Sequence, residues 1–134
     1  MRPGCSPRRR LLPLGESLKR RYNTRMVKGR EIRKKLAALR GGRLLFLPHA
    51  IEQMTRPERM IRRQDVRAVI EQGEVIEDYP DDARGHSCLM LGFGADGRPV
   101  HVVCAPKSDY LAIITAYLPS LDEWSDGYRV RRNP

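Results

Sequence analysis

The sequence is poor in cysteine and has no long hydrophobic run. Three cysteines in 134 residues, Cys5, Cys88 and Cys104, are too few for a disulfide framework. This usage is typical of a reducing compartment, so we expect a cytoplasmic protein. No apolar run approaches the ~18 residues that a membrane span needs, and LLPL at residues 11–14 is too short for the core of a signal peptide. We therefore expect no membrane partner.

Motifs for metal, phosphate-loop and serine-hydrolase chemistry are also missing. There is no Cys-x-x-Cys pair, no glycine-rich loop between a strand and a helix, and no serine nucleophile elbow. His101 and Cys104 lie three apart in a predicted strand and point to opposite faces, so they are poor ligands for one metal. We predict neither a metal nor another cofactor. Aromatic residues make up only 6% of the chain, which supplies a stacking platform for single-stranded RNA poorly.

The chain has an excess of positive charge at its N-terminal end. Residues 1–43 contain 15 Lys/Arg and 2 Asp/Glu, whereas residues 44–134 contain 11 and 14. A basic segment of this kind is typical of proteins that bind a phosphate backbone or an acidic partner. Three alternatives stay open, namely a solvated tail, sequence upstream of a true start at Met26, and an organelle transit peptide.

The composition divides the chain into three segments. Residues 1–25 combine clustered Arg with three prolines and no periodicity, which predicts a disordered basic tail. Residues 26–43 are predicted to form a basic helical arm that ends at Gly41 and Gly42. Its narrow apolar stripe consists of Val27, Ile32, Leu36 and Leu39. The candidate nucleic-acid-binding residues on this arm are Lys28, Arg30, Arg33, Lys34, Lys35 and Arg40.

Residues 44–134 are predicted to form an α+β domain. RLLFLP indicates a short extended segment, and HAIEQM and RQDVRAVIEQG indicate two helices, the second ending at Gly73. Four candidate strands follow, EVIEDY (74–79), SCLMLGF (87–93), PVHVVCA (99–105) and YLAIITAYL (110–118). The loops GADG and PKSD are short enough for hairpins. Helices followed by tightly connected strands predict a three- to four-stranded antiparallel meander.

Hairpin lengths predict the register and therefore the face on which His101 lies. A four-residue GADG loop pairs Met90 with His101, and a four-residue PKSD loop pairs His101 with Ile114. The face against which the helices pack then carries Leu89, Leu91, Val100, Val102, Cys104, Leu111, Ile113 and Thr115. His101 lies on the opposite face, and a slip of one residue would reverse this assignment. Because the second face is also apolar, we expect it to be covered by the helix at 27–40, the segment around Trp124, a second copy of the chain or a partner.

Several motifs in order resemble one sequence family. PHAIEQM, DVRAVIEQGEVIEDYPDD, RGHSCLMLG, GRPVHVVCA and IITAYLP, followed by Trp124, resemble domain-of-unknown-function family 4258 over roughly residues 44–128. That family has no established activity. Its helices followed by an antiparallel sheet are similar in pattern to RelE-like ribonuclease toxins of toxin–antitoxin pairs. The resemblance implies metal-independent RNA cleavage in which the ribose 2′-hydroxyl attacks the adjacent phosphate.

The candidate catalytic residues for such a reaction are His101, His49, Arg84 and Tyr117. A histidine can act as base or acid near neutral pH, a guanidinium can grip a phosphate, and a tyrosine can donate a hydrogen bond. For each there is a structural alternative. His101 could be bonded to a carbonyl or a Tyr hydroxyl, His49 could orient a helix start, Arg84 could pair with Asp81 or Asp82, and Tyr117 could be a core-edge aromatic.

Two functions follow from these observations. The first is a toxin-type ribonuclease that acts on RNA and is paired with a small antitoxin-like protein. The alternative is a non-catalytic domain whose apolar sheet face and basic arm bind a protein partner, a second copy of the chain or nucleic acid.

Overall fold

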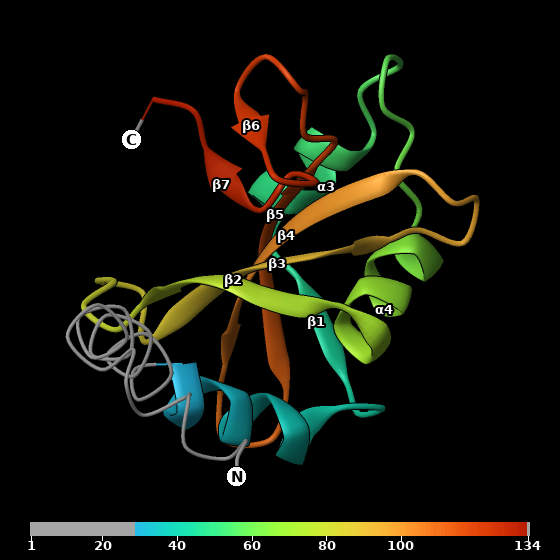
Figure 1. Cartoon of the computed structure of the whole chain (residues 1–134). Coiled ribbons are helices and arrows are strands. Elements are labelled where there is room, and N and C mark those ends of the chain that lie inside the picture. The colour runs from blue at the N-terminus through green and yellow to red at the C-terminus, as the bar shows by residue number, and fades with distance from the viewer. Residues whose placement is uncertain (1–28, 134) are drawn as a thin grey trace, which may run out of the picture.

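The structure is a computed structural model that describes residues 29–133, so the predicted tail at 1–25 lies outside the described residues. The described part of the chain begins in a helix, which covers residues 29–39. The elements that follow are β1 (Leu44–Phe46), α3 (Pro48–Met54), α4 (Arg63–Gln72), β2 (Glu74–Tyr79), β3 (Ser87–Phe93), β4 (Pro99–Pro106), β5 (Leu111–Tyr117), β6 (Trp124–Ser125) and β7 (Val130–Arg131) (Figure 1). The α+β class is therefore confirmed. Within the described residues, no helix is long and apolar enough to cross a membrane.

The sheet has five strands in the order β1-β5-β4-β3-β2 and is mixed. Strands β2 to β5 pair antiparallel with their neighbours in sequence, whereas β1 pairs parallel with β5. The strands of the predicted three- to four-stranded antiparallel meander are present as β2 to β5, but the prediction missed the fifth strand, β1, which makes the sheet mixed. Between β1 and β2 the chain passes through α3 and α4, and it returns to the sheet at the opposite edge. The short segment Leu44–Phe46 consequently lies beside Leu111–Ile113 and runs in the same direction.

Three helices cover one face of the sheet. In the N-terminal helix Ile32 and Leu36 are buried, and Leu39 is partly buried, as the predicted stripe requires. This helix ends before Gly41, whose φ of +79° is a left-handed conformation that favours glycine. The core on this face is a single cluster. Its members from the helices and their linkers are Ile32, Leu36, Ala50, Met54, Ile61, Val66, Val69 and Ile70, and those from the sheet are Cys88, Met90, Val100, Val102, Cys104, Leu111, Ile113 and Ala116. The described part of the predicted basic arm is thus packed into the domain.

The register between β3 and β4 differs from the predicted one by one residue. Phe93 pairs with Pro99, so the loop has five residues, and the Gly94 N–H donates to the Arg98 carbonyl at 2.8 Å. Met90 consequently faces the helices, and Leu91 is the residue opposite His101. A second irregularity between Val103 and Cys104 places His101 beside Tyr117, where Ile114 was predicted.

His101 nevertheless lies on the face away from the helices, as predicted. Its neighbours Val100 and Val102 belong to the helix-side cluster, and successive residues in a strand point to opposite faces. The C-terminal segment with β6 and β7 covers this second face at His101, where Trp124 contacts the imidazole. Figure 1 shows this hairpin in red, on the other side of the sheet from α3. Of the four covers considered from sequence, the segment around Trp124 is the one that reaches His101.

Candidate functional site

The imidazole of His101 is fully buried, and both of its nitrogens have partners. Nε2 lies 2.9 Å from the Tyr128 carbonyl oxygen, and Nδ1 lies 3.1 Å from the Tyr117 hydroxyl. A carbonyl can only accept, so Nε2 carries the hydrogen, and Nδ1 accepts the hydrogen of the Tyr117 hydroxyl. The ring of Trp124 packs edge-on against the imidazole at 4.4 Å between centroids. Both structural partners considered from sequence, a carbonyl and a Tyr hydroxyl, are therefore present.

Burial fixes the ionisation of this pair. It lowers the pKa of His101 to about 4, although the bond to the Tyr128 carbonyl acts in the opposite direction. It also raises the pKa of Tyr117 to about 12. At neutral pH the imidazole is therefore uncharged, its only basic nitrogen is engaged, and water has no access to it. A group in this state is poorly suited to abstract a proton from a substrate.

The other two predicted catalytic residues lie elsewhere. His49 is exposed at the start of α3, a helix whose Ala50 and Met54 pack on the opposite face of the sheet from His101. Arg84 lies in the loop between β2 and β3, where Lys107 donates to its carbonyl at 2.6 Å. Lys107 is six residues beyond His101 along β4, which corresponds to about 20 Å. The structure thus brings His101 and Tyr117 together but leaves His49 and Arg84 apart from them.

Arg84 belongs to a polar cluster at the start of β3. Its guanidinium pairs with Asp82 at 2.9 Å, as the structural alternative required, and Ser87 donates to the same carboxylate at 2.6 Å. The bonds from Arg84 and then Ser87 hold the pKa of Asp82 well below its usual range. Beside them, His86 Nε2 lies 2.6 Å from Asp78 Oδ1, and both side chains are largely buried. The second oxygen of Asp78 is buried and has no hydrogen-bond partner among the described residues.

Sequence reasoning missed the pairing of Asp78 with His86. The signal was available, because a hairpin between EVIEDY and SCLMLGF brings the end of one strand beside the start of the next. Asp78 pairs in register with Cys88, two residues beyond His86. Counting along this hairpin would have placed the carboxylate and the imidazole together.

The predicted nucleic-acid-binding residues lie on the outer surface of the N-terminal helix. Arg30, Arg33, Lys34, Lys35 and Arg40 are all exposed, and Lys28 lies outside the described residues. The same helix buries Ile32 and Leu36, so its position on the domain is fixed. Lys35 forms an ion pair at 3.6 Å with Glu31, which is the only acidic residue among residues 29–39 of the helix. The result is a basic surface on a docked element.

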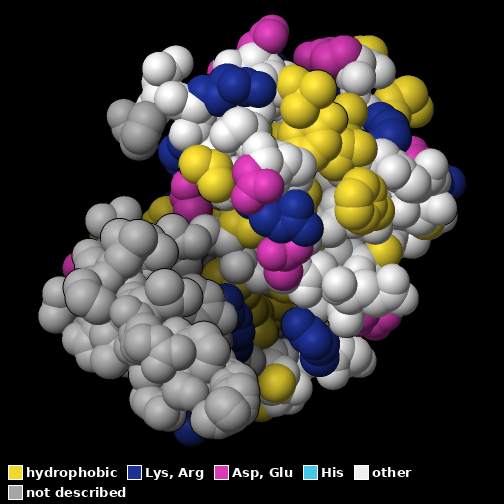
Figure 2. Space-filling view, in the orientation of Figure 1, with side chains coloured by type: hydrophobic (Ala, Val, Ile, Leu, Met, Phe, Trp, Pro, Cys, Tyr) yellow, Lys and Arg dark blue, Asp and Glu magenta, His cyan; other side chains and the backbone are white. Residues whose placement is uncertain are grey.

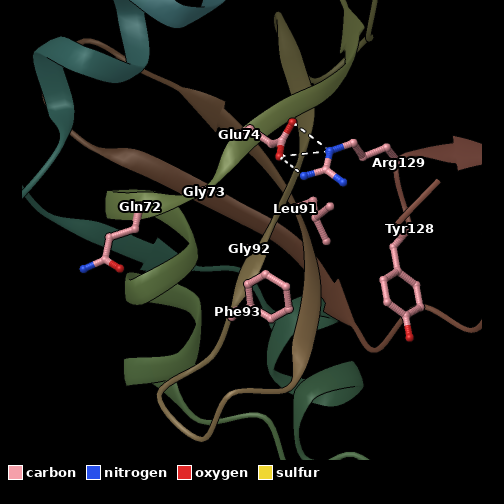
Figure 3. Close-up of a pocket in the computed structure, with 9 residues that line it drawn as sticks. Gln72, Gly73, Glu74, Leu91, Gly92, Phe93, Tyr128 and Arg129 are labelled. Carbon is pink, nitrogen blue, oxygen red and sulfur yellow. Dashed lines mark hydrogen bonds and ion pairs between the residues drawn. The ribbon is translucent and has the colours of Figure 1, made fainter.

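A pocket of about 280 Å³ lies on the His101 side of the sheet. Its lining residues are Gln72, Gly73, Glu74, Leu91, Gly92, Phe93, Gly127, Tyr128 and Arg129. Figure 3 shows the rings of Phe93 and Tyr128 on opposite sides of the opening, with Leu91 between them and the Glu74–Arg129 ion pair at one end. Arg129 donates to both carboxylate oxygens of Glu74, at 2.8 to 3.2 Å. Sequence reasoning missed this pocket because Tyr128 lies 35 residues beyond Phe93 and outside every predicted strand.

The described residues include no group of three His, Cys, Asp or Glu that could hold a metal ion. Cys88 and Cys104 face each other across β3 and β4 with their sulfurs 3.9 Å apart, and both are buried. The bond to Cys88 and burial raise the pKa of the Cys104 thiol well above its usual value.

Of the comparisons with known proteins, the one with sequence families gives a match. The family described as Domain of unknown function (DUF4258) matches residues 46–118, which include β1 to β5 in part or whole. No curated protein and no solved structure matches the chain.

Proposed function

The chain belongs to the DUF4258 family, whose description gives no activity, and we propose from its geometry that the protein binds RNA through the outer surface of helix 29–39. The observation that carries this proposal is the set of exposed cationic side chains on one docked helix, Arg30, Arg33, Lys34 and Lys35, with Arg40 directly after its end. Because the helix is already packed through Ile32 and Leu36, binding does not require that it first be ordered.

RNA is favoured over an acidic protein by the kind of charge on this surface. Cations that lie along a helix can each neutralise a phosphate and release its counterion, without a matching shape in the partner. The order of elements in the domain, helices before an antiparallel run of strands, is also the pattern on which the resemblance to RelE-like proteins rests. The imidazole of His101 itself is not part of a docking surface, because Trp124 packs over it.

A second candidate function, RelE-like RNA cleavage without a metal, is favoured by the Asp78–His86 pair. If the Asp78 carboxylate accepts the hydrogen on His86 Nε2, then Nδ1 is the basic nitrogen of the ring. A base at this position would take the proton from a ribose 2′-hydroxyl as its oxygen attacks the adjacent phosphate. The bond from phosphorus to the 5′-oxygen would then break, and the protonated ring would give its proton to that leaving oxygen. Arg84 would bind the phosphate by exchanging its present partner, Asp82. This arrangement retains Arg84 from the predicted catalytic set and replaces His101 with His86.

RNA binding is tested by titration of a labelled single-stranded oligonucleotide at several salt concentrations. Lys34→Ala should weaken binding and reduce the slope of log K against log salt by about 1, because one phosphate contact is lost. Arg56→Ala, which removes an exposed cation between α3 and α4, is the matched control and should leave both quantities unchanged. Equal effects of the two substitutions, or tighter binding to poly-glutamate than to RNA, would contradict the proposal.

Cleavage is tested on the same oligonucleotide in the presence of a chelator. His86→Ala should abolish the appearance of 2′,3′-cyclic phosphate ends, whereas Arg56→Ala should not affect it. If the wild-type protein binds RNA and yields no such ends, the chain is a binding protein without this chemistry.

A further inference from the structure

We infer that the pocket between Phe93 and Tyr128 receives one unpaired base of the bound RNA. This inference rests on the proposed RNA binding and adds a site that the basic helix does not contain. A pocket of about 280 Å³ is just below the range for small-ligand sites, ~300–1,000 Å³, and therefore suits one ring system better than a folded partner.

Two aromatic side chains, Phe93 and Tyr128, line the pocket with their rings side by side (Figure 3). Phe93 is 60% exposed at the end of β3, although large aromatic rings are usually more deeply buried. Tyr128 lies across the opening from it, and the almost fully buried Leu91 lies between the two rings (Figure 3). Aromatic rings stack on the face of any base, so this arrangement does not depend on base identity.

The rim of the pocket carries polar side chains. Gln72 lines the pocket from the end of α4, and its amide points away from the two rings (Figure 3). The Glu74–Arg129 ion pair closes one end, with its charges already matched to each other (Figure 3).

The backbone at Tyr128, which lines the pocket, is in a left-handed conformation that contacts within the fold stabilise. Asp126, Gly127 and Tyr128 all have left-handed φ angles, +51°, +65° and +71°. Such a conformation in a residue other than glycine is strained and occurs preferentially at ligand sites. The buried His101 holds it in place, since its Nε2–H donates to the Tyr128 carbonyl at 2.9 Å. His101 is thus a positioning residue for the pocket wall.

Strand β2 links the pocket to the basic helix. Glu74 lines the pocket at one end of the strand, and Asp78 lines a small cavity with Arg33 of the helix at the other. The two residues are four apart, which corresponds to about 13 Å along the strand. Because the helix and the pocket lie on opposite faces of the sheet, an RNA strand that contacts both must pass around the edge strand β2. Figure 2 shows hydrophobic side chains gathered on the upper part of this view, near Lys, Arg, Asp and Glu side chains.

The experiment uses a single-stranded RNA oligonucleotide that contains one 2-aminopurine, whose fluorescence falls when it stacks, and a separate end label that reports binding. We expect quenching with the wild-type protein. Phe93→Ala should remove the quenching and weaken binding roughly tenfold, because one stacked base is lost. Phe93→Leu should also lose the quenching, since it keeps apolar area and removes the ring. Leu121→Ala, which truncates another exposed apolar side chain, is the matched control and should behave like the wild type.

The two readouts separate the inference from the function on which it rests. If the end label reports salt-dependent binding but Phe93→Ala and Phe93→Leu retain the quenching, the pocket is not a base site and RNA binding stands. If the end label reports no binding, both proposals fail. Because Phe93 is mostly exposed, its substitution should leave the thermal unfolding midpoint nearly unchanged. If Phe93→Ala lowers the midpoint strongly, the comparison is made with Phe93→Leu, which keeps the apolar side chain.

Discussion

At the scale of single residues, His101 shows how burial changes what a histidine can do. The ring is neutral, bonded at both nitrogens and packed against Trp124, and its position secures the backbone of Tyr128. A lone histidine in an apolar strand is equally compatible with catalysis and with this role when only the sequence is known. The decisive partner, the Tyr128 carbonyl, lies 27 residues further along the chain.

We predict that His101 makes the protein sensitive to mild acid. The folded-state pKa of about 4 lies below the ordinary value of 6.5, so the unfolded chain binds the proton more readily. The stability that this group contributes is present above pH 6.5 and is lost as the pH falls toward 4, by up to about 3 kcal/mol. Urea denaturation at pH 7, 6, 5 and 4.5 measures the loss.

The control for this prediction is His101→Gln, which has a neutral side chain over the whole range. Carboxylates titrate in the lower part of the range in both proteins, so the difference between the two curves isolates the imidazole. Parallel curves would contradict the assignment of the pH dependence to His101.

At the scale of elements, one carboxylate connects α4 to the loop between β3 and β4. Asp65 is fully buried, and its two oxygens accept the Arg62 N–H at 2.8 Å and the Ala95 N–H at 2.7 Å. The first bond caps the helix, and the second fixes the loop that sets the register of β4. Gly94 passes so close that a Cβ there would lie 2.8 Å from the carboxylate, which explains the glycine.

We predict that Asp65→Ala lowers the free energy of unfolding by about 2–3 kcal/mol, because a buried cap and a loop bond are lost together. Asp109→Ala, at an exposed position in the turn between β4 and β5, should change it by less than about 0.5 kcal/mol. Equilibrium denaturation in urea measures both. Equal losses would mean that Asp65 has no special role.

Periodicity predicted the helices and the long strands almost to the residue. It did not predict the register between β3 and β4 or the pairing of β1 with β5. The GADG loop is one residue longer than assumed because Gly97 takes a φ of +89°, as in a type I turn followed by a left-handed residue. This turn geometry is set by local sequence, and the glycine at the fourth position of GADG, Gly97, indicated it. The parallel partner of β1 could not be predicted locally, because three residues carry too little pattern and their partners lie near residue 112.

At the scale of the whole molecule, the basic helix and the sheet share one hydrophobic core. Sequence composition separated residues 26–43 from the domain by their charge, although the apolar stripe already required a surface on which to lie. Ile32 and Leu36 are fully buried against the same cluster as α4. The buried inner surface of this helix therefore stabilises the fold, and its charged outer surface is the one that we propose binds RNA.

We predict that Leu36→Ala lowers the free energy of unfolding by about 2–4 kcal/mol, because it opens a cavity in the core. Lys34→Ala, two residues away on the exposed surface, should leave stability within about 0.5 kcal/mol while weakening RNA binding. Removal of residues 1–43 should therefore destabilise the domain as well as reduce binding. Thermal unfolding and RNA titration of the three variants check this separation, and full stability in the Leu36→Ala variant would contradict it.

The parallel pairing of β1 with β5 also has a consequence for synthesis on the ribosome. Leu44 and its partner Leu111 are 67 residues apart, so the first strand of the sheet leaves the ribosome several seconds before its only strand partner, at ~5–20 residues per second. During that interval the exposed strand and the basic helix before it lack the surface that buries them. Translation must pass residue 113 before the edge of the sheet can close.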